Sequence, residues 1–405
     1  MDQTENIKAI LEKTFKYLEI NKDITIDNWI FRSVTAFSFD LLVACAIIGG
    51  FTSYFGDPIV CEEKGGHRIE LIEAHCWLHG TRDLEDKLGL QGVNCTKGGD
   101  KLNRNLYYEW VVLVLILSAI LLKIPALIWS WIEGGLMSTF SGKYKDMKIL
   151  KEGKRDFKQA VETEATNFTK LQKSLSTKCY YSKFLLCQFL AWGLLIGVLF
   201  MNDRFLEYNF VSYGHNVIEF WKKSEPERSE DVNPMCQAFP TKVGCEVILK
   251  NHTTGKEEVT DAVCILRHNI INEKIYLVLW FWFVIMFAVS GFQLILEFFF
   301  VTLPYYFLRL QFFIFQAIKY KIMSTDMKKY LATCSVGDVF VLYQISKNTN
   351  SNFFNELLEY LSKPDQADQP VRVQHVGLPG RAKPFRMGGG RSQRSRVAAH
   401  RDPVR

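Results

Sequence analysis

The chain has 405 residues, a formal net charge of +6 and a mean hydropathy of zero, with 48% hydrophobic residues. That mean conceals very apolar blocks beside very charged ones, a pattern typical of an integral membrane protein and not of a soluble one. The charge gives no argument for a nucleic-acid partner, because much of it comes from the far C-terminus. The N-terminus has no short apolar core with a small-residue cleavage site, so we expect no signal peptide to be removed.

Residues 1–33 predict an amphipathic N-terminal helix, because apolar side chains recur at helical spacing at Ile7, Ile10, Leu11, Phe15 and Leu18. Such a helix either lies on the membrane or the helix bundle, or folds into a pore. Residues 34–54 form the first predicted span, which carries one acid, Asp40. An ionisable group in a span usually faces a cavity, a pore or a partner. Asp40 is therefore a candidate pore-lining residue, with a snorkelling side chain as the alternative.

The second predicted span, residues 107–132, is the most distinct. From Trp110 to Trp131 its only charged residue is Lys123, and 22 helical residues are about 33 Å long, close to the hydrocarbon thickness of a bilayer. Aromatic residues gather at both ends, as expected at the two membrane interfaces. Pro125 is tolerated in a membrane helix when neighbouring groups satisfy the carbonyl that it leaves unbonded.

Two further apolar segments, residues 183–201 and 275–301, complete a set of four spans. Polar loops at 55–106 and 202–274 alternate with a Lys-rich loop at 133–182. Residues 302–362 alternate apolar and basic side chains and predict a helical domain near the membrane. From residue 363 the chain is rich in Pro, Gly, Arg and Gln, which predicts a disordered basic tail.

Cysteine and lysine placement predicts the same sidedness independently. The Lys-rich loop is expected in the cytosol by the positive-inside rule. Six of the ten cysteines lie in the two polar loops, at Cys61, Cys76, Cys95, Cys236, Cys245 and Cys264. Disulfides persist outside the cell, so both loops are expected to be extracellular and both termini cytosolic. Fifteen pairings are possible, and spacing does not choose among them. Cys45 and Cys187 are expected as small apolar residues within spans, and Cys179 and Cys334 as unpaired thiols.

Three N-glycosylation sequons begin at Asn94, Asn167 and Asn251. On this topology Asn94 and Asn251 are glycosylation candidates, whereas Asn167 lies in the cytosol and is expected never to be modified.

Several motifs resemble those of innexins, the invertebrate gap-junction family related to pannexins. They are Ile26-Asp27-Asn28 with Phe31-Arg32, Gly56-Asp57-Pro58-Ile59 with Cys61, His75-Cys76-Trp77, Tyr107-Tyr108-Glu109-Trp110-Val111 with Pro125, and Gly337-Asp338-Val339-Phe340-Val341-Leu342 with Asn348. The resemblance covers residues from about 20 to 361. The family signature usually has Gln where Glu109 stands, and many members carry two cysteines in each extracellular loop, whereas this chain has three.

The resemblance implies an all-α membrane protein: a four-helix transmembrane bundle with two disulfide-linked extracellular loops and a helical cytoplasmic domain. It further implies a plasma-membrane channel of about eight subunits, formed by this chain alone or with other innexins and docked to a hemichannel of the apposed cell. The N-terminal segment and the first span are expected to line the pore. The resemblance also implies disulfides between the two loops of one subunit. Membrane lipid is the other expected partner, and no cofactor or metal is expected.

Three alternatives stay open beside the docked channel. One is an unpaired, pannexin-like hemichannel, which glycans at Asn94 or Asn251 would favour by obstructing docking. A second is a four-span adhesion or scaffold protein, although the Cys-Cys-Gly element of tetraspanins is absent. The third is a metal-dependent enzyme that binds zinc through His75 and His79, spaced i and i+4. This reading lacks an acid–base partner and competes with a disulfide at Cys76, so we expect no enzyme.

Overall fold

The computed structural model of the chain describes residues 24–62, 69–82, 104–105, 110–141, 154–174, 176–207, 210–250, 257–302 and 325–363. The first 23 residues of the predicted N-terminal helix and the tail after residue 363 lie outside the described residues.

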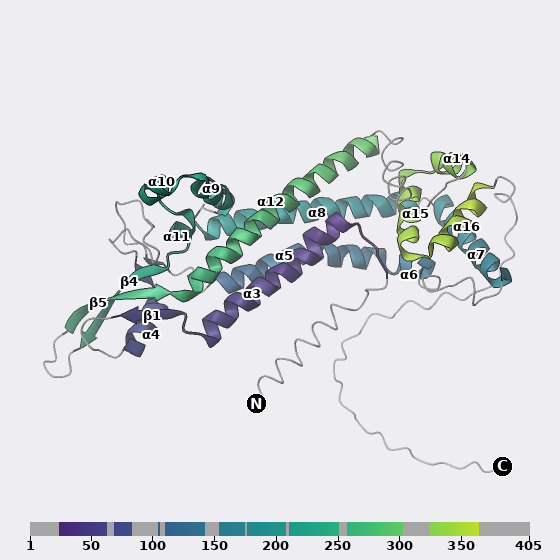
Figure 1. Ribbon diagram of the computed structural model, residues 1–405. Helices are drawn as coiled ribbons and strands as arrows, with labels where there is room; N and C mark the ends of the chain where they lie inside the picture. Colours follow the sequence, from purple (N-terminus) through teal and green to yellow (C-terminus); the bar gives the residue numbers. More distant parts are fainter. Residues whose placement is uncertain are drawn as a thin grey trace, which may run out of the picture. The chain divides into compact units, whose positions relative to one another are not determined.

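Four long helical stretches dominate the described chain (Figure 1). The first is made of three consecutive elements, α2 (Trp29–Arg32), η1 (Ser33–Phe37) and α3 (Ser38–Phe55), and the others are α5 (Val111–Glu133), α8 (Ser176–Phe205) and α12 (Arg267–Thr302). Each contains a segment long and apolar enough to cross a membrane: Trp29–Phe51, Val111–Glu133, Thr177–Phe205 and Arg267–Phe298. Of the predicted all-α fold, the four helices long and apolar enough to span a membrane are confirmed.

The four spans pack as one bundle. Helix α5 contacts α3 and α8, and α12 contacts α8 and α3. Leucines at 42, 115, 195 and 279 are fully buried between them. Between 33% and 44% of the residues in an 18-residue apolar stretch of each span are buried, and large apolar side chains such as Leu117, Leu186 and Phe292 remain exposed. Apolar faces of this extent require lipid or further protein chains against them.

The first span changes its helical hydrogen bonding at η1, a single π-helical turn. There the hydroxyl of Ser38 donates to the carbonyl of Ser33 at 3.0 Å and accepts from the indole N–H of Trp282 in α12 at 2.8 Å. The Ser33 carbonyl also accepts from the backbone N–H of Ser38, which is the i to i+5 bond of the π-helical turn. Ser38 thus bonds both its own helix and the neighbouring span.

A five-stranded antiparallel sheet joins the two loops that connect spans 1 to 2 and spans 3 to 4, and the sequence analysis did not predict it. We call it the loop sheet. Its order is β1-β5-β4-β2-β3. The first loop supplies β1 (Ile59–Glu62), β2 (Thr81–Arg82) and β3 (Arg104–Asn105), and the second loop supplies β4 (Lys242–Lys250) and β5 (Glu257–Leu266). The central pair β5–β4 therefore belongs to one loop and is flanked on both sides by strands of the other.

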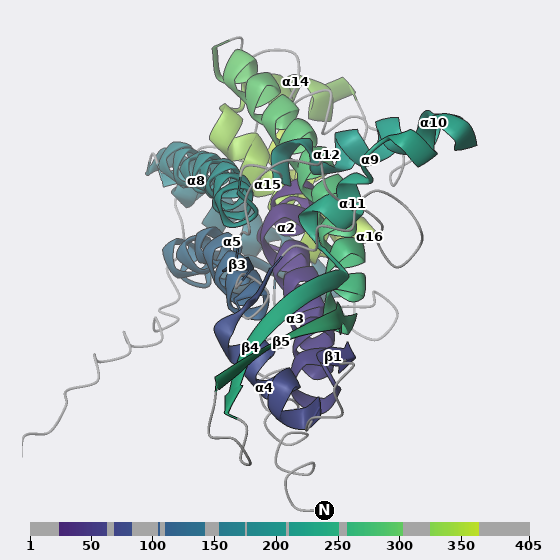
Figure 2. The same cartoon turned by 90° about the vertical axis from the view of Figure 1, so that its left-hand side faces the viewer.

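Four short helices accompany the loop sheet: α4 (Ile69–His79), α9 (Phe210–Lys222), α10 (Glu225–Glu230) and α11 (Pro234–Ala238). Helix α4 packs on β1 and β4, as seen from the sheet side in Figure 2. Helix α9 packs on α12 so closely that a Cβ atom at Gly214 would lie 2.1 Å from the ring of Trp280. Only glycine fits at that contact.

A second group of helices lies at the other ends of the spans (Figure 1). It comprises α6 (Leu136–Ser141), α7 (Lys154–Lys173), α14 (Thr325–Thr333), α15 (Val336–Asn348) and α16 (Ser351–Ser362), which we call the end domain. Helix α16 packs on α7 and α14, and α15 packs on α6 and on α8. The helical domain predicted for residues 302–362 therefore includes α14 to α16, and the Lys-rich loop adds α6 and α7 to it.

Candidate functional site

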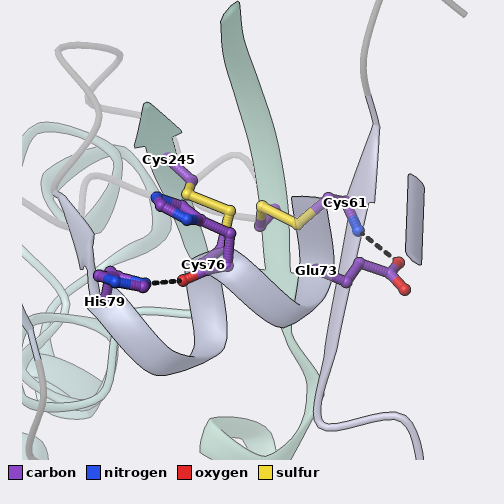
Figure 3. Close-up of a disulfide and its surroundings, with 7 residues drawn as sticks. Cys61, Glu73, Cys76, His79 and Cys245 are labelled. Atoms are coloured by element: carbon purple, nitrogen blue, oxygen red, sulfur yellow. Dashed lines mark hydrogen bonds between the residues drawn. A yellow bond between two sulfur atoms is a disulfide. The ribbon is translucent and has the colours of Figure 1, made fainter. Parts of the chain in front are cut away.

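Two disulfides fasten the first loop to the second within the loop sheet (Figure 3). Cys61 in β1 is bonded to Cys264 in β5, at directly opposite positions of the two strands. Cys76 in α4 is bonded to Cys245 in β4. The bonds join residues 203 and 169 positions apart, and a cross-link over so long a loop removes about 5 kcal/mol of chain entropy from the unfolded state in the loop-closure model.

The disulfides form the centre of a small core of their own. All four sulfur-bearing residues are buried, among Ile59, Ile72, Val243, Val247, Ala262 and Leu266. The residues on β4 and β5 that face this core alternate with exposed ones, as a half-buried strand requires. The backbone N–H of Cys61 also donates to the Glu73 carboxylate at 3.0 Å, which ties β1 to α4 (Figure 3). The two loops are thus one folded unit.

The other two loop cysteines are only partly placed. Cys236, in α11, takes part in a disulfide, and Cys95 lies outside the described residues. Cys45, Cys179, Cys187 and Cys334 are in no disulfide; Cys45 and Cys187 are buried within spans and Cys179 is exposed.

Span 1 and the loop sheet are connected by a short polar junction. Gly56 ends α3 with an extended backbone. Pro58 accepts a hydrogen bond from the backbone N–H of Arg267 at 3.1 Å, and the Arg267 guanidinium lies 3.9 Å from the Asp57 carboxylate. Arg267 is the first residue of α12, so the start of the first loop meets the end of the second loop here. The motif residues Gly56, Asp57 and Pro58 therefore have a structural role in that junction.

The candidate pore-lining residue Asp40 lies on an exposed stripe of α3. The stripe continues through Ala44, Ile47, Ile48 and Phe51, all of them exposed in the single chain. A carboxylate on such a face needs water or a polar partner, since an unpaired charge in lipid is costly. Asp40 therefore favours an aqueous or polar neighbour at its end of the stripe, whereas the other four side chains are apolar.

The histidines considered as zinc ligands lie on α4 with their rings stacked, 4.2 Å between centroids. Within the described residues, the one group of three potential metal ligands is Cys61, Cys76 and Cys264. All three of those sulfurs are in disulfides and offer no thiolate. Neither His75 nor His79 belongs to that group.

The remaining predicted site residues divide between described and undescribed parts. Trp110 is exposed at the start of α5, and Pro125 is buried within that helix. Tyr107, Tyr108, Asn94 and Asn251 lie outside the described residues. The sequence analysis missed the strands of the loop sheet, although Val243, Cys245 and Val247 alternate with polar or small residues and could have indicated β4.

Comparison with known proteins identifies the family. The family model described as Innexin matches residues 27–364. Innexin inx2 of Schistocerca americana is 30% identical over 353 residues, covering 84% of this chain and 93% of the relative. Innexin inx2 of Drosophila melanogaster is 29% identical (85% and 93% covered), and Innexin shaking-B of the same species is 26% identical (88% and 94% covered). With four spans and two loops joined by disulfides, the chain belongs to the innexin family, whose members are subunits of gap-junction channels.

Proposed function

We propose that this chain assembles, alone or with other innexins, into a ring of about eight subunits in the plasma membrane and that two such rings on apposed cells dock through their loop sheets. In this arrangement both termini and the end domain are cytosolic, and the loop sheet is extracellular. Ions and small molecules pass from cell to cell through the joined lumen.

Two features support this orientation. The loops that form the loop sheet contain all of the disulfide-bonded cysteines among the described residues, and such bonds persist outside the cell. The loop between spans 2 and 3 carries the Lys-rich sequence, which favours the cytosol.

The single observation that carries the docking proposal is the fusion of both loops into one sheet. Two independent loops would lose much conformational entropy on meeting a partner. Here the strands of both loops are hydrogen-bonded in one sheet and linked by two disulfides. That conformational entropy is therefore already lost on folding, and docking costs less free energy for ordering the loops.

Within the ring, the exposed stripe of α3 that contains Asp40 is proposed to face the lumen. Selection would then depend on pore diameter and on the charge of the lining rather than on removal of an ion's hydration shell. The exposed apolar faces of the other spans would contact lipid and neighbouring subunits.

Electrical recording from paired cells that express the chain tests the proposal. A junctional current between two expressing cells, absent when only one cell of the pair expresses the chain, supports a docked channel of this chain alone. Current in single cells without current between pairs would select the unpaired hemichannel, which glycans at Asn94 or Asn251 would favour. If the protein reaches the cell surface and neither single cells nor pairs carry a current, this chain alone does not form a channel.

A further inference from the structure

The segment that leads into span 1 is held by a side chain of the end domain more than 300 residues away. Asn348, the last residue of α15, accepts a hydrogen bond from the backbone N–H of Thr25 at 2.5 Å and donates one to the Thr25 carbonyl at 2.6 Å. The carboxamide thus pairs with both polar groups of one residue, as a neighbouring strand would. It recognises the backbone, so the side chain of Thr25 is not needed.

The next two carbonyls along the chain are bonded as well. The indole N–H of Trp129 in α5 donates to the Ile26 carbonyl at 2.9 Å. The ammonium of Lys347 donates to the Asp27 carbonyl at 3.2 Å and lies 4.3 Å from the centre of the Tyr343 ring. Three consecutive carbonyls, at residues 25, 26 and 27, therefore accept from Asn348, Trp129 and Lys347.

The donors that hold this segment are themselves firmly placed. Asn348 and Trp129 are 2% and 1% exposed, and Asn348 also donates to the carbonyl of Gln344 at 2.8 Å. The ring of Trp129 packs on Phe184 of α8, which stacks on Phe340 of α15 at 4.9 Å. Spans 2 and 3 and the end domain therefore form one support, and residues 25–27 are attached to it.

We propose that Asn348, Trp129 and Lys347 are positioning residues of the channel, which fix residues 25–27 and thereby make conduction depend on how α15 sits on spans 2 and 3. This inference rests on the proposed function, because residues 25–27 join the N-terminal segment to the span proposed to line the lumen. A displacement of α15 removes two of the three donors at once, since Asn348 and Lys347 are both on that helix. The end domain thus controls the entrance of span 1 through backbone hydrogen bonds.

The holding contacts are tested first without reference to current, by hydrogen exchange of the purified oligomer in detergent. We expect Asn348→Ala to speed exchange of the Thr25 amide by about tenfold or more, because that N–H loses its acceptor and the Thr25 carbonyl loses its donor. Thr25→Ala is the matched control and should exchange like the parent, since both bonds are made by the Thr25 backbone. Trp129→Phe removes the indole N–H that donates to the Ile26 carbonyl, together with part of a buried ring, and it provides a second test should Asn348→Ala fail to assemble.

The effect on conduction is then measured in cells at matched surface expression. We expect Asn348→Ala and Trp129→Phe to change the steady-state conductance at least about twofold, while Asn352→Ala, at an exposed position of α16, leaves it unchanged. Parent-like exchange in both test variants would overturn the proposal, and so would faster exchange with parent-like conductance. If the parent itself carries no current, the proposed function fails and this inference with it, whatever the exchange rates show.

Discussion

Gly337, near the start of α15, lies against the backbone carbonyl of Thr177 in α8, so close that a Cβ atom on residue 337 would stand 2.4 Å from the Thr177 oxygen. Non-bonded carbon and oxygen atoms do not approach to that distance without strong repulsion, and here the neighbour is backbone, which yields little. The contact lets α15 pack directly on span 3. Next to it, Asp338 accepts from the backbone N–H of Ser335 at 2.9 Å and from the side-chain amide of Gln172 at 3.0 Å.

Gly337→Ala should therefore separate α15 from α8 and destabilise the protein by about 1–3 kcal/mol, the usual cost of overpacking. The change should appear as a lower midpoint of thermal unfolding for the purified oligomer. Asn352→Ala, on the exposed surface of α16, is the control and should unfold like the parent. An unfolding midpoint for Gly337→Ala that equals the parent's would show that the close approach does not exist in solution.

Which parts of this arrangement the sequence predicts depends on how far apart in the chain the interacting residues lie. The spans were predictable because about 20 apolar residues in a row meet the bilayer thickness without reference to any other part of the chain. Helix α7 was missed in the Lys-rich loop, yet Phe157, Val161 and Phe168 are buried on one face of it at helical spacing, and that spacing was readable.

Non-local pairings were not readable in this way. Strand β1 pairs with β5 about 200 residues later, and nothing in the four residues of β1 specifies that partner. The role of Asn348 depends likewise on a backbone segment 323 positions earlier, and a backbone group has no sequence signature. The six loop cysteines could be located by their loops but not paired, because pairing depends on the sheet.

We predict that the third disulfide joins Cys95 to Cys236. Cys236 is disulfide-bonded, four other loop cysteines are bonded to one another, and the cysteines outside the loops are unpaired, so Cys95 is the one cysteine left in the sequence. Mass spectrometry of a non-reduced digest should contain a peptide pair with this link. A Cys236 peptide linked to any other cysteine, or recovered with a reduced thiol, would refute the assignment.

Cys179 offers a test of sidedness, because it is exposed at the end of span 3 remote from the loop sheet. A membrane-impermeant maleimide should label it only after the cells are permeabilised, and Cys179→Ser should abolish that labelling. Cys334 should contribute little, because burial first and the Asp338 charge second raise the pKa of its thiol to about 11, and the thiol form is unreactive. Labelling of Cys179 on intact cells would reverse the proposed topology.

Asp40 gives a direct test of the pore-lining stripe. Asp40→Asn removes one negative charge per subunit from the face of α3 proposed to line the lumen, and it keeps the side-chain volume. The reversal potential in a salt gradient should shift towards lower preference for cations, with surface expression unchanged. Ile47→Val, on the same stripe, changes no charge and should leave the reversal potential unaltered. A reversal potential equal to the parent's for Asp40→Asn would remove Asp40 from the lining.

Lys347 should make the attachment of residues 25–27 depend on pH. Burial lowers the pKa of its ammonium from 10.5 to about 8, with the Asp27 carboxylate opposing this shift and Arg32 adding to it. The charges of Asp27 and Arg32 act on Lys347, and its ammonium also contacts the ring of Tyr343. Burial, and after it the charge of Asp27, raise the pKa of Tyr343 to about 12. Tyr343 stays neutral in this interval, so Lys347 is the group of this cluster that titrates between pH 8 and 10.5.

In that interval the attached state binds fewer protons than the detached or unfolded state, so its stability rises with pH and falls as pH drops towards 8. The full difference between the two pKa values corresponds to about 3 kcal/mol, of which a scan from pH 7.5 to 9.5 samples a part. Thermal unfolding of the parent and of Lys347→Met should be compared over that scan. Methionine carries no charge, so the parent should gain stability relative to the variant as pH rises. The idea fails if the difference in unfolding temperature between the two proteins stays constant over the scan, or if the parent becomes less stable relative to the variant at higher pH. Either result would show that Lys347 is not buried against the Asp27 carbonyl.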